Sequence, residues 1–196
     1  MGVQLNTMTQ MYMKKRVRIM RVLIIRHGET DWNKKRLLQG AVDIPLNEIG
    51  LMQAEKAYEQ LKDEHIDAVF CSPLTRTRQT ATAVMRDRNV PIIYDERIIE
   101  RRFGVAEGKD YYDIDFERSW LPNQPPICEG METFEVVFDR IANFFDDIYN
   151  EYRDKTVLVV THGGISIMCG YYFLGPPKTD RSEYFCENCV VREYNK

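Results

Sequence analysis

Two short apolar runs, far apart along the chain, have the same arrangement. Residues 22–25 are aliphatic and end just before the Arg26-His27 pair, and residues 157–160 form a similar run shortly before His162. Such runs are typical of strands that are buried on both faces of a mainly parallel sheet. These sheets bind ligands at the carboxyl ends of their strands, so both histidines are expected at that edge. If the two strands are neighbours, the two imidazole rings lie side by side.

The rest of the pattern alternates between helices and strands. Leu51, Ala54, Tyr58 and Leu61 recur at helical spacing behind Asn47, which is a suitable N-cap. From residue 134 to residue 152, apolar and mostly aromatic residues follow helical spacing and predict a helix that packs on the sheet. Further strands are expected at residues 67–71, 91–94 and 188–194, and further helices at residues 75–87, 111–119 and 163–174. This order of elements predicts an α/β protein with a mainly parallel sheet.

The beginning of the chain differs from the rest. Residues 1–19 are polar and have no apolar periodicity, which predicts a flexible N-terminal tail in front of a single domain at residues 20–196. The basic residues within 14–18 would suit a patch for a partner or a membrane surface, but a solvated tail is the favoured interpretation.

Composition excludes several classes of protein. The net charge of −3 argues against a nucleic-acid partner, and no apolar run approaches the roughly 20 residues of a membrane helix. Five cysteines without a secretory signal indicate the reducing cytoplasm. The spacing Cys186-x-x-Cys189 is typical of a zinc site. Structural zinc needs four ligands, however, and His65 is the only histidine not already assigned to the binding edge. The two cysteines are therefore interpreted as small, partly buried residues. The sequence does not predict an oligomeric state.

Charged residues accompany the two histidines at the expected binding edge. Arg26 precedes the first histidine, Arg76 follows the strand at 67–71, and Glu100 lies in a loop expected to return over the edge. Two arginines suit a dianionic phosphate, because each guanidinium offers forked donors. The alternatives are an exposed arginine at position 76, and a surface carboxylate at position 100 that pairs with the neighbouring arginines.

This set of groups fits the transfer of a phosphoryl group. A neutral histidine with a pKa near 6.5 is nucleophilic at neutral pH, so the phosphoryl group can pass to His27. Glu100 is the candidate acid for the leaving alkoxide, which requires a dry or anionic neighbourhood. The helices after Ser72 and after Gly163-Gly164 are expected to add backbone N–H donors for the phosphate. We expect no metal and no cofactor, because arginines can supply the positive charge and the sequence has no nucleotide-binding loop.

The motifs around these residues form an ordered set along the chain. They are Arg26-His27-Gly28-Glu29-Thr30 with Trp32-Asn33, Asp43-Ile44-Pro45-Leu46 with Gly50 and Gln53-Ala54, Ser72-Pro73-Leu74 with Arg76 and Gln79-Thr80-Ala81, Glu100 with Gly104 and Glu107-Gly108, Gly130-Met131-Glu132-Thr133, and Thr161-His162-Gly163-Gly164. The set resembles the motifs of the histidine phosphatases, also called the phosphoglycerate-mutase-like superfamily. The resemblance covers about residues 20–194, and the ordered set is far more specific than a lone Arg-His-Gly.

The resemblance implies a fold, a mechanism and a set of site residues. The implied fold is a three-layer α/β/α sandwich with a mostly parallel central sheet. His27 is the implied nucleophile, which forms a phosphohistidine, and Glu100 is the implied proton donor and then the base for water. The residues implied to hold the phosphoryl group or the substrate are Arg26, Arg76, His162, Asn33, Gln39, Gly40 and Gly163.

The favoured function is a metal-independent, cytoplasmic phosphomonoesterase that acts on small phosphorylated metabolites. An inactive phosphate-binding or scaffold protein is one alternative, disfavoured because no expected catalytic residue is missing. A phosphoglycerate mutase is the other. It is disfavoured because the segment between Glu100 and His162 is short, and its middle, residues 111–132, has a single cation, Arg118. The sequence departs from the family pattern at Arg102, Val105 and Ala106, so the substrate stays open.

Overall fold

The computed structural model describes residues 19–196, apart from the side chain of Phe116. Its centre is a five-stranded sheet with the order β3-β2-β4-β1-β5, in which only β5 is antiparallel to its neighbour. The strands are β1 Arg21–Arg26, β2 Ala68–Cys71, β3 Ile92–Tyr94, β4 Thr156–Thr161 and β5 Val191–Asn195. The predicted tail lies outside the described residues except for Ile19.

Strands β1 and β4 are parallel, as the two apolar runs predict, and they are direct neighbours, which the sequence left open. Arg26 pairs with Thr161 in the register, so His27 and His162 follow at the same edge. Successive side chains of β1 point to opposite faces, and all of them from Val22 to Ile25 are buried. The strand is therefore covered on both sides.

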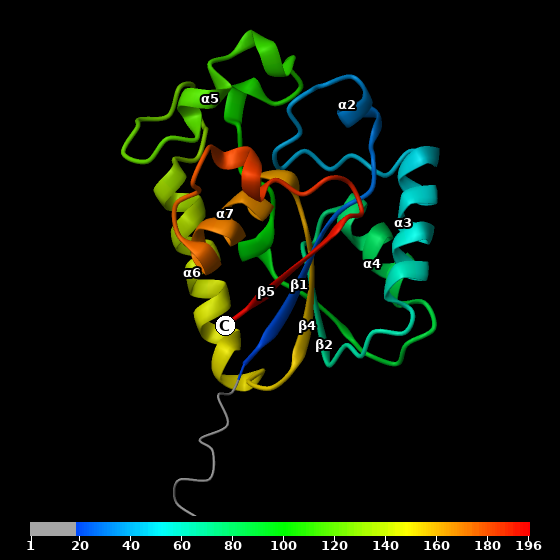
Figure 1. Ribbon diagram of the computed structural model, residues 1–196. Helices are drawn as coiled ribbons and strands as arrows, with labels where there is room; N and C mark the ends of the chain where they lie inside the picture. Colours follow the sequence, from blue (N-terminus) through cyan, green and yellow to red (C-terminus); the bar gives the residue numbers. More distant parts are fainter. Residues whose placement is uncertain (1–18) are drawn as a thin grey trace, which may run out of the picture.

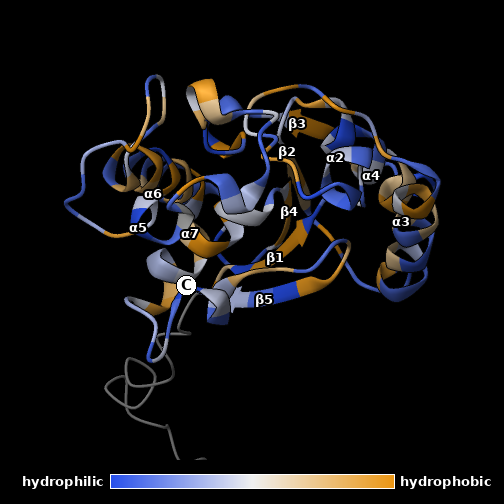
Figure 2. Cartoon of the chain, turned by 90° about the horizontal axis from the view of Figure 1, so that it is seen from above, coloured by the Kyte–Doolittle hydropathy of each residue, from blue (hydrophilic) through white to orange (hydrophobic). Residues whose placement is uncertain are grey.

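Helices cover the two faces of the sheet and complete a three-layer α/β/α sandwich (Figure 1). One face packs against α3 (Glu48–Leu61) and α4 (Thr75–Met85), and the other against α6 (Phe134–Glu151) and α7 (Gly163–Leu174). Viewed from above, the hydrophobic colours of β1 and β4 lie between these two pairs of helices (Figure 2). The predicted fold class is confirmed.

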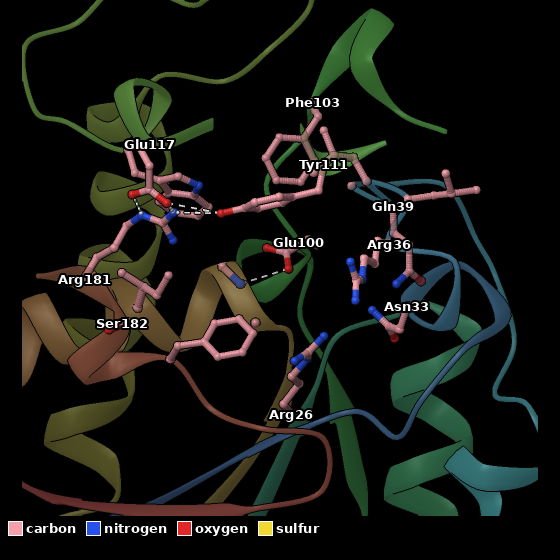
Figure 3. Close-up of a pocket in the computed structure, with 18 of the residues that line it drawn as sticks. Arg26, Asn33, Arg36, Gln39, Glu100, Phe103, Tyr111, Glu117, Arg181 and Ser182 are labelled. Atoms are coloured by element: carbon pink, nitrogen blue, oxygen red, sulfur yellow. Dashed lines mark hydrogen bonds and ion pairs between the residues drawn. The ribbon is translucent and has the colours of Figure 1, made fainter. Parts of the chain in front are cut away.

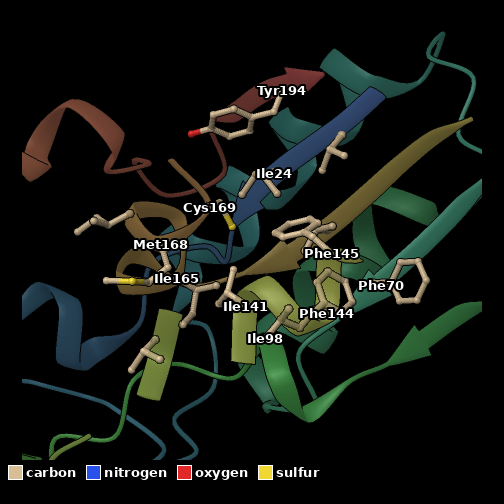
Figure 4. Close-up of a cluster of buried hydrophobic side chains, with 14 of the residues drawn as sticks. Ile24, Phe70, Ile98, Ile141, Phe144, Phe145, Ile165, Met168, Cys169 and Tyr194 are labelled. Carbon is tan, nitrogen blue, oxygen red and sulfur yellow. The ribbon is translucent and has the colours of Figure 1, made fainter. Parts of the chain in front are cut away.

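The long helix α6 supplies most of the aromatic core. Its residues Phe134, Val137, Ile141, Phe144, Phe145 and Ile148 are buried, and they pack in one cluster with Ile24 and Phe70 of the sheet (Figure 4). The ring of Phe70 meets that of Phe144 edge to face, with centroids 5.3 Å apart. The predicted packing of this stripe on the sheet is confirmed.

The buried face of α3 differs from the predicted one. Leu51 is 47% exposed, and the buried positions are Gly50, Ala54, Ala57 and Leu61. These residues follow the same helical spacing, but three of them are small. An apolar pattern weighted toward large side chains overlooks them, although small residues let the helix approach its neighbours closely. Asn47 caps the helix as predicted, since its Oδ1 accepts a hydrogen bond from the Gly50 amide at 2.8 Å.

The predicted helix at residues 111–119 is split in two. A 3-10 turn at Tyr111–Asp113 is followed by the single-turn helix α5, Phe116–Ser119. Asp110 caps the first piece. Ile114 is extended and interrupts the helix, and Asp115 then caps the beginning of α5. The other predicted elements are present with slightly shifted ends, and the single-turn helix α2 (Asp31–Lys34) was not predicted.

The cysteines of the predicted pair form no disulfide, and the described residues contain neither a metal-ligand cluster nor a membrane-spanning helix. Cys186 and Cys189 are buried and unpaired, and no group of three or more potential metal ligands occurs within residues 19–196. In the same range, no helix has both the length and the apolar character needed to cross a membrane.

We predict that Gly50→Ala destabilises the fold. A Cβ atom at Gly50 would lie 2.1 Å from the Glu29 carbonyl oxygen, where the first turn of α3 meets the loop after His27. Alanine normally stabilises a helix by up to about 1 kcal/mol relative to glycine. Here overpacking against main chain should reverse the sign and cost about 1–3 kcal/mol.

Urea unfolding measures this effect. Gln60→Ala, at an exposed position of the same helix, is the matched control and should change the free energy of unfolding little. Equal stabilities for Gly50→Ala and the wild type would contradict the close contact.

Candidate active site

A cavity of about 470 Å³ opens above the carboxyl ends of β1 and β4 (Figure 3). The side chains of Arg26, His27, Arg76 and Glu100 line it together with Gly163. Asn33, Gln39 and Gly40 line it as well. All the predicted site residues line the cavity except His162, whose ring lies next to that of His27.

The hydrogen bonds of His27 identify its proton-bearing nitrogen. Nδ1 lies 2.7 Å from the carbonyl oxygen of Gly28, which can only accept, so Nδ1 carries the hydrogen. In the neutral ring Nε2 then carries a lone pair. Burial, followed by the positive charges of Arg76 and Arg26, lowers the pKa of His27 well below its ordinary value. The ring is therefore neutral and nucleophilic at neutral pH.

His162 sits directly beside His27 but makes different contacts. The two ring centroids are 5.2 Å apart, and His162 is fully buried. Its Nδ1 accepts a hydrogen bond from Arg76 Nε at 3.2 Å, so its Nε2 carries the hydrogen and lies 2.8 Å from the hydroxyl oxygen of Ser72. Both ring nitrogens already have hydrogen-bond partners. A hydrogen bond from His162 to a phosphoryl oxygen would require one of these nitrogens to change its partner.

Arg26 and Arg76 place two buried guanidinium groups next to the His27 ring. Arg76 is fully buried and donates to the carbonyl oxygens of Val42 and Gly40 at 2.7 and 2.8 Å. Arg26 lies 4.9 Å from the Phe185 ring centroid, and its Nε is buried without a partner among the described residues. Burial lowers the pKa of Arg26 and lowers that of Arg76 to about 10, so both remain cationic at neutral pH. Underused buried donors of this kind suit an anionic ligand.

Glu100 faces the cavity from the loop that crosses the sheet edge (Figure 3). Its Oε1 accepts from the Arg101 amide at 2.9 Å and its Oε2 from the Gly164 amide at 3.0 Å. The neighbouring arginine side chains bind elsewhere, for example that of Arg101 to the Glu132 carbonyl oxygen. The interpretation of Glu100 as a surface carboxylate paired with arginines is therefore wrong.

The segment after α2 supplies the other predicted lining residues. Asn33 Oδ1 accepts from the Thr30 amide at 3.2 Å, so the Nδ2 group, which has no partner within residues 19–196, is left for the cavity. Gln39 is buried, and its Oε1 accepts from the Thr30 hydroxyl at 3.0 Å. Gly40 contributes its carbonyl oxygen to Arg76, so this segment also holds the arginine.

Comparison with known proteins identifies the family of this chain. The family model of the histidine phosphatase superfamily (branch 1) matches residues 22–195. The chain belongs to the histidine phosphatase superfamily. Its relatives carry phosphatase names, and this protein is a phosphatase of that superfamily.

Three relatives illustrate the similarity. The chain is 37% identical over 142 residues to the uncharacterised phosphatase PhoE of Bacillus subtilis, which covers 72% of this chain and 71% of that protein. It is 32% identical over 151 residues to phosphoserine phosphatase 1 of Hydrogenobacter thermophilus, covering 74% and 71%. The crystal structure of the α-ribazole phosphatase of Shigella flexneri superposes with a TM-score of 0.74 at 28% identity, covering 88% of this chain and 89% of that chain.

Carboxylates of the protein occupy one amide at each of the two helix ends that the sequence predicts as phosphate donors. The Thr75 amide, at the start of α4, donates to the Asp43 carboxylate at 2.7 Å, and Arg76 is the residue of α4 that lines the cavity. At the start of α7, the Gly164 amide is taken by Glu100. The sequence prediction overlooked these carboxylates because they come from distant segments of the chain.

An ion pair that the sequence analysis did not find holds the loop around Glu100. Arg140 on α6 donates to the Ile99 carbonyl oxygen at 2.8 Å and pairs with the Glu132 carboxylate at 3.2 Å. Glu132 in turn accepts from the Arg102 amide at 2.8 Å. The main chain is therefore fixed on both sides of Glu100. The sequence marked Glu132 only as part of a family-like motif. It gave no sign of the partner, Arg140, which lies 8 residues further on.

The upper part of the cavity contains lining residues that the sequence analysis did not connect with the site. They come from the segment after α2, the loop after Glu100, the split helix with its flanking residues, and the 3-10 turn at Arg181–Tyr184 with its cap, and they include Arg36, Phe103, Tyr111, Tyr112, Glu117, Trp120, Asp180, Arg181 and Ser182. These residues lie in loops and short turns, where no periodic pattern marks them.

We predict that the two buried histidines make the stability of this phosphatase depend on pH. The pKa values of His27 and His162 are lowered in the folded state, mainly by burial and then by Arg76. The unfolded chain therefore takes up protons near its ordinary pKa of about 6.5, while the folded chain does not. The free energy of unfolding should fall as the pH drops from about 7 to 5.5, by up to about 1.4 kcal/mol per pH unit for each histidine.

Urea unfolding over this range, which lies above the titration of ordinary carboxylates, measures the slope. His27→Gln and His162→Gln should each flatten it. The control is His65→Gln, which removes a side chain that is 84% exposed and should leave the slope as it is. A wild-type slope in both cavity variants would contradict the assignment.

Proposed function

We propose that this phosphatase hydrolyses phosphomonoesters of small metabolites through a phosphohistidine on His27. One observation carries the proposal. The His27 ring holds its hydrogen on Nδ1 through Gly28, which leaves the Nε2 lone pair, beside two buried and underused guanidinium groups. This arrangement pairs a nucleophile with positive charge where the phosphoryl group would develop negative charge.

Arg26 and Arg76 would bind the phosphoryl oxygens. Arg76 has one N–H left on each terminal nitrogen after its bonds to Val42 and Gly40, and Arg26 has its Nε free of protein partners within the described chain. The Nδ2 group of Asn33 and the backbone of Gly163, at the start of α7, would add neutral donors. Gln39 and Gly40 complete this end of the cavity.

Glu100 would move the proton in both steps. In the first step His27 Nε2 forms a bond to phosphorus, the ester P–O bond breaks, and the leaving alkoxide takes a proton from Glu100. In the second step Glu100 takes a proton from water, whose oxygen bonds to phosphorus as the P–N bond breaks. Inorganic phosphate leaves, and both His27 and Glu100 return to their starting states.

His162 would act mainly through its neighbours, since both of its nitrogens are occupied. Its Nδ1 accepts a hydrogen bond from Arg76 Nε, and its ring packs against that of His27. The predicted direct contact of His162 with a phosphoryl oxygen stays a prediction, as do metal independence and the cytoplasmic location. A neutral, buried His162 also avoids adding another positive charge that would repel the arginines.

Small phosphorylated substrates are consistent with the size of the cavity. A volume of about 470 Å³ fits a metabolite rather than a folded protein segment. Relatives are named for phosphoserine and α-ribazole phosphate chemistry, and these esters belong in a first substrate screen. The mutase alternative stays disfavoured because the segment between Glu100 and His162 is short and its middle, residues 111–132, has a single cation, Arg118.

The first prediction from this mechanism is that His27 becomes phosphorylated. Rapid acid-free quenching during turnover, followed by mass spectrometry, should find an acid-labile phosphate on the peptide that contains His27. His27→Asn should abolish both the label and the turnover, while His65→Gln, which alters an exposed histidine, should keep both. A label that persists in His27→Asn, or is absent during single turnover of the active wild type, would rule the intermediate out.

The second prediction is that Glu100→Gln affects substrates unequally. Alkyl phosphates need a protonated leaving group and should slow by about 10²–10⁴. p-Nitrophenyl phosphate needs little protonation and should slow much less. Because the second step is the same for both substrates, the comparison uses kcat/KM, which reports on the first step, and equal losses in kcat/KM would remove Glu100 from the role of acid. Glu107, the next carboxylate to consider, instead accepts from the amides of Ala41 and Phe103.

A further inference from the structure

The two walls of the upper cavity carry charges that the proposed chemistry does not use. Arg36 lies on the wall formed by the segment after α2, and Arg181 and Glu117 lie on the opposite wall (Figure 3). Asp180, which directly precedes Arg181 in the chain, also lines the cavity. These groups differ in whether their charges are already matched by the protein.

The charges on the opposite wall are compensated. Arg181 meets the Glu117 carboxylate with two contacts, Nη2 to Oε1 at 2.5 Å and Nε to Oε2 at 3.2 Å. The hydroxyl of Tyr111 lies 3.2 Å from the same carboxylate, and the Arg181 guanidinium stacks 5.6 Å from the Trp120 ring. Asp180 accepts from the Ser182 amide at 2.7 Å as the cap of its turn.

Arg36 has no such partner. Its guanidinium makes no hydrogen bond or ion pair with any residue from 19 to 196, and its nearest aromatic neighbour is Tyr112, with the ring centroid 6.0 Å away. Its main chain is fixed, because its amide donates to the Asn33 carbonyl oxygen and its carbonyl oxygen accepts from the Tyr111 amide, both at 3.0 Å. The side chain is exposed at the cavity wall, on a backbone that holds it there.

The cavity also has an apolar lining. Leu37, Leu38, Phe103, Tyr111 and Trp120 all contribute to it. Such walls favour an aromatic or aliphatic body in the ligand. An anionic group at the far end of that body would meet an unmatched cation.

We propose that Arg36 binds a second anionic group, such as a carboxylate, at the end of the substrate away from the scissile phosphate. The preferred substrates are then phosphomonoesters with an apolar body and a distal anion. This inference rests on the proposed function only for the placement of the scissile phosphate at His27. Lys34 and Lys35, the neighbouring cations, do not line the cavity.

The size of the effect follows from the exposure of Arg36. A forked guanidinium–carboxylate contact is strong when it is dry, but exposure and salt weaken it. We expect the distal carboxylate to improve binding by about three- to tenfold at low salt. The gain should shrink as the ionic strength rises.

Calorimetry with phosphonates tests this without depending on turnover. The probes are benzylphosphonate and its meta- and para-carboxy derivatives, and the measured quantity is the ratio of their Kd values. In the wild type at least one carboxy derivative should bind more tightly, and in Arg36→Gln the ratio should fall toward one. Lys35→Gln removes the same charge one residue away, outside the cavity, and should keep the wild-type ratio.

Three results would overturn the proposal. They are a ratio near one for both derivatives in the wild type, an equal loss in Arg36→Gln and Lys35→Gln, and a loss in Arg181→Gln while Arg36→Gln keeps the preference. The matching benzyl phosphates test the proposed function separately. If the phosphonates show the preference but the phosphates are not hydrolysed, the function fails while the anion subsite stands.

Discussion

The parallel pairing of β1 with β4 is the constraint on which the site depends. Its register places Arg26 beside Thr161, so the chain leaves both strands at the same level as His27 and His162. The His27 amide continues the pairing by donating to the Thr161 carbonyl oxygen at 3.0 Å. A slip of the register would separate the two rings and turn buried side chains toward the wrong face. The apolar layers on both sides of the sheet therefore protect the catalytic geometry as well as the fold.

Burial of positive charge is the main electrostatic problem that the structure has to solve. A buried guanidinium loses its hydration, and the loss must be offset by protein partners. Arg76 finds these partners in two carbonyl oxygens and in a histidine that stays neutral. Arg26 keeps a buried Nε that has no partner among residues 19–196. A bound phosphate would satisfy these donors, so the same feature that strains the unliganded protein would favour the ligand. Burial is also the main cause of the lowered pKa values of both histidines, and the positive charge of Arg76 is the second cause.

The sequence predicts the base of the cavity better than its mouth. Strand ends are marked by apolar runs, and His27, Arg76 and His162 follow directly from their positions after such runs. The Arg140–Glu132 pair and the occupation of Thr75 by Asp43 depend on contacts between distant segments, which no local pattern encodes. Part of the buried face of α3, Gly50 and Ala57, was missed for another reason, since glycine and alanine carry weak apolar signals although they decide how closely elements pack.

This difference also separates chemistry from specificity in this phosphatase. The groups at the base are fixed by the sheet and by α4 and α7, elements whose positions tolerate little change. The groups at the mouth, Arg36 and Arg181 among them, sit on loops and short turns. Loops tolerate substitution and insertion, so the distal contacts can change while the phosphoryl site stays the same. The sequence motifs therefore predict the groups that would bind the phosphate. The groups that would bind the remainder of the substrate can be inferred only from the charges and surfaces of the folded cavity.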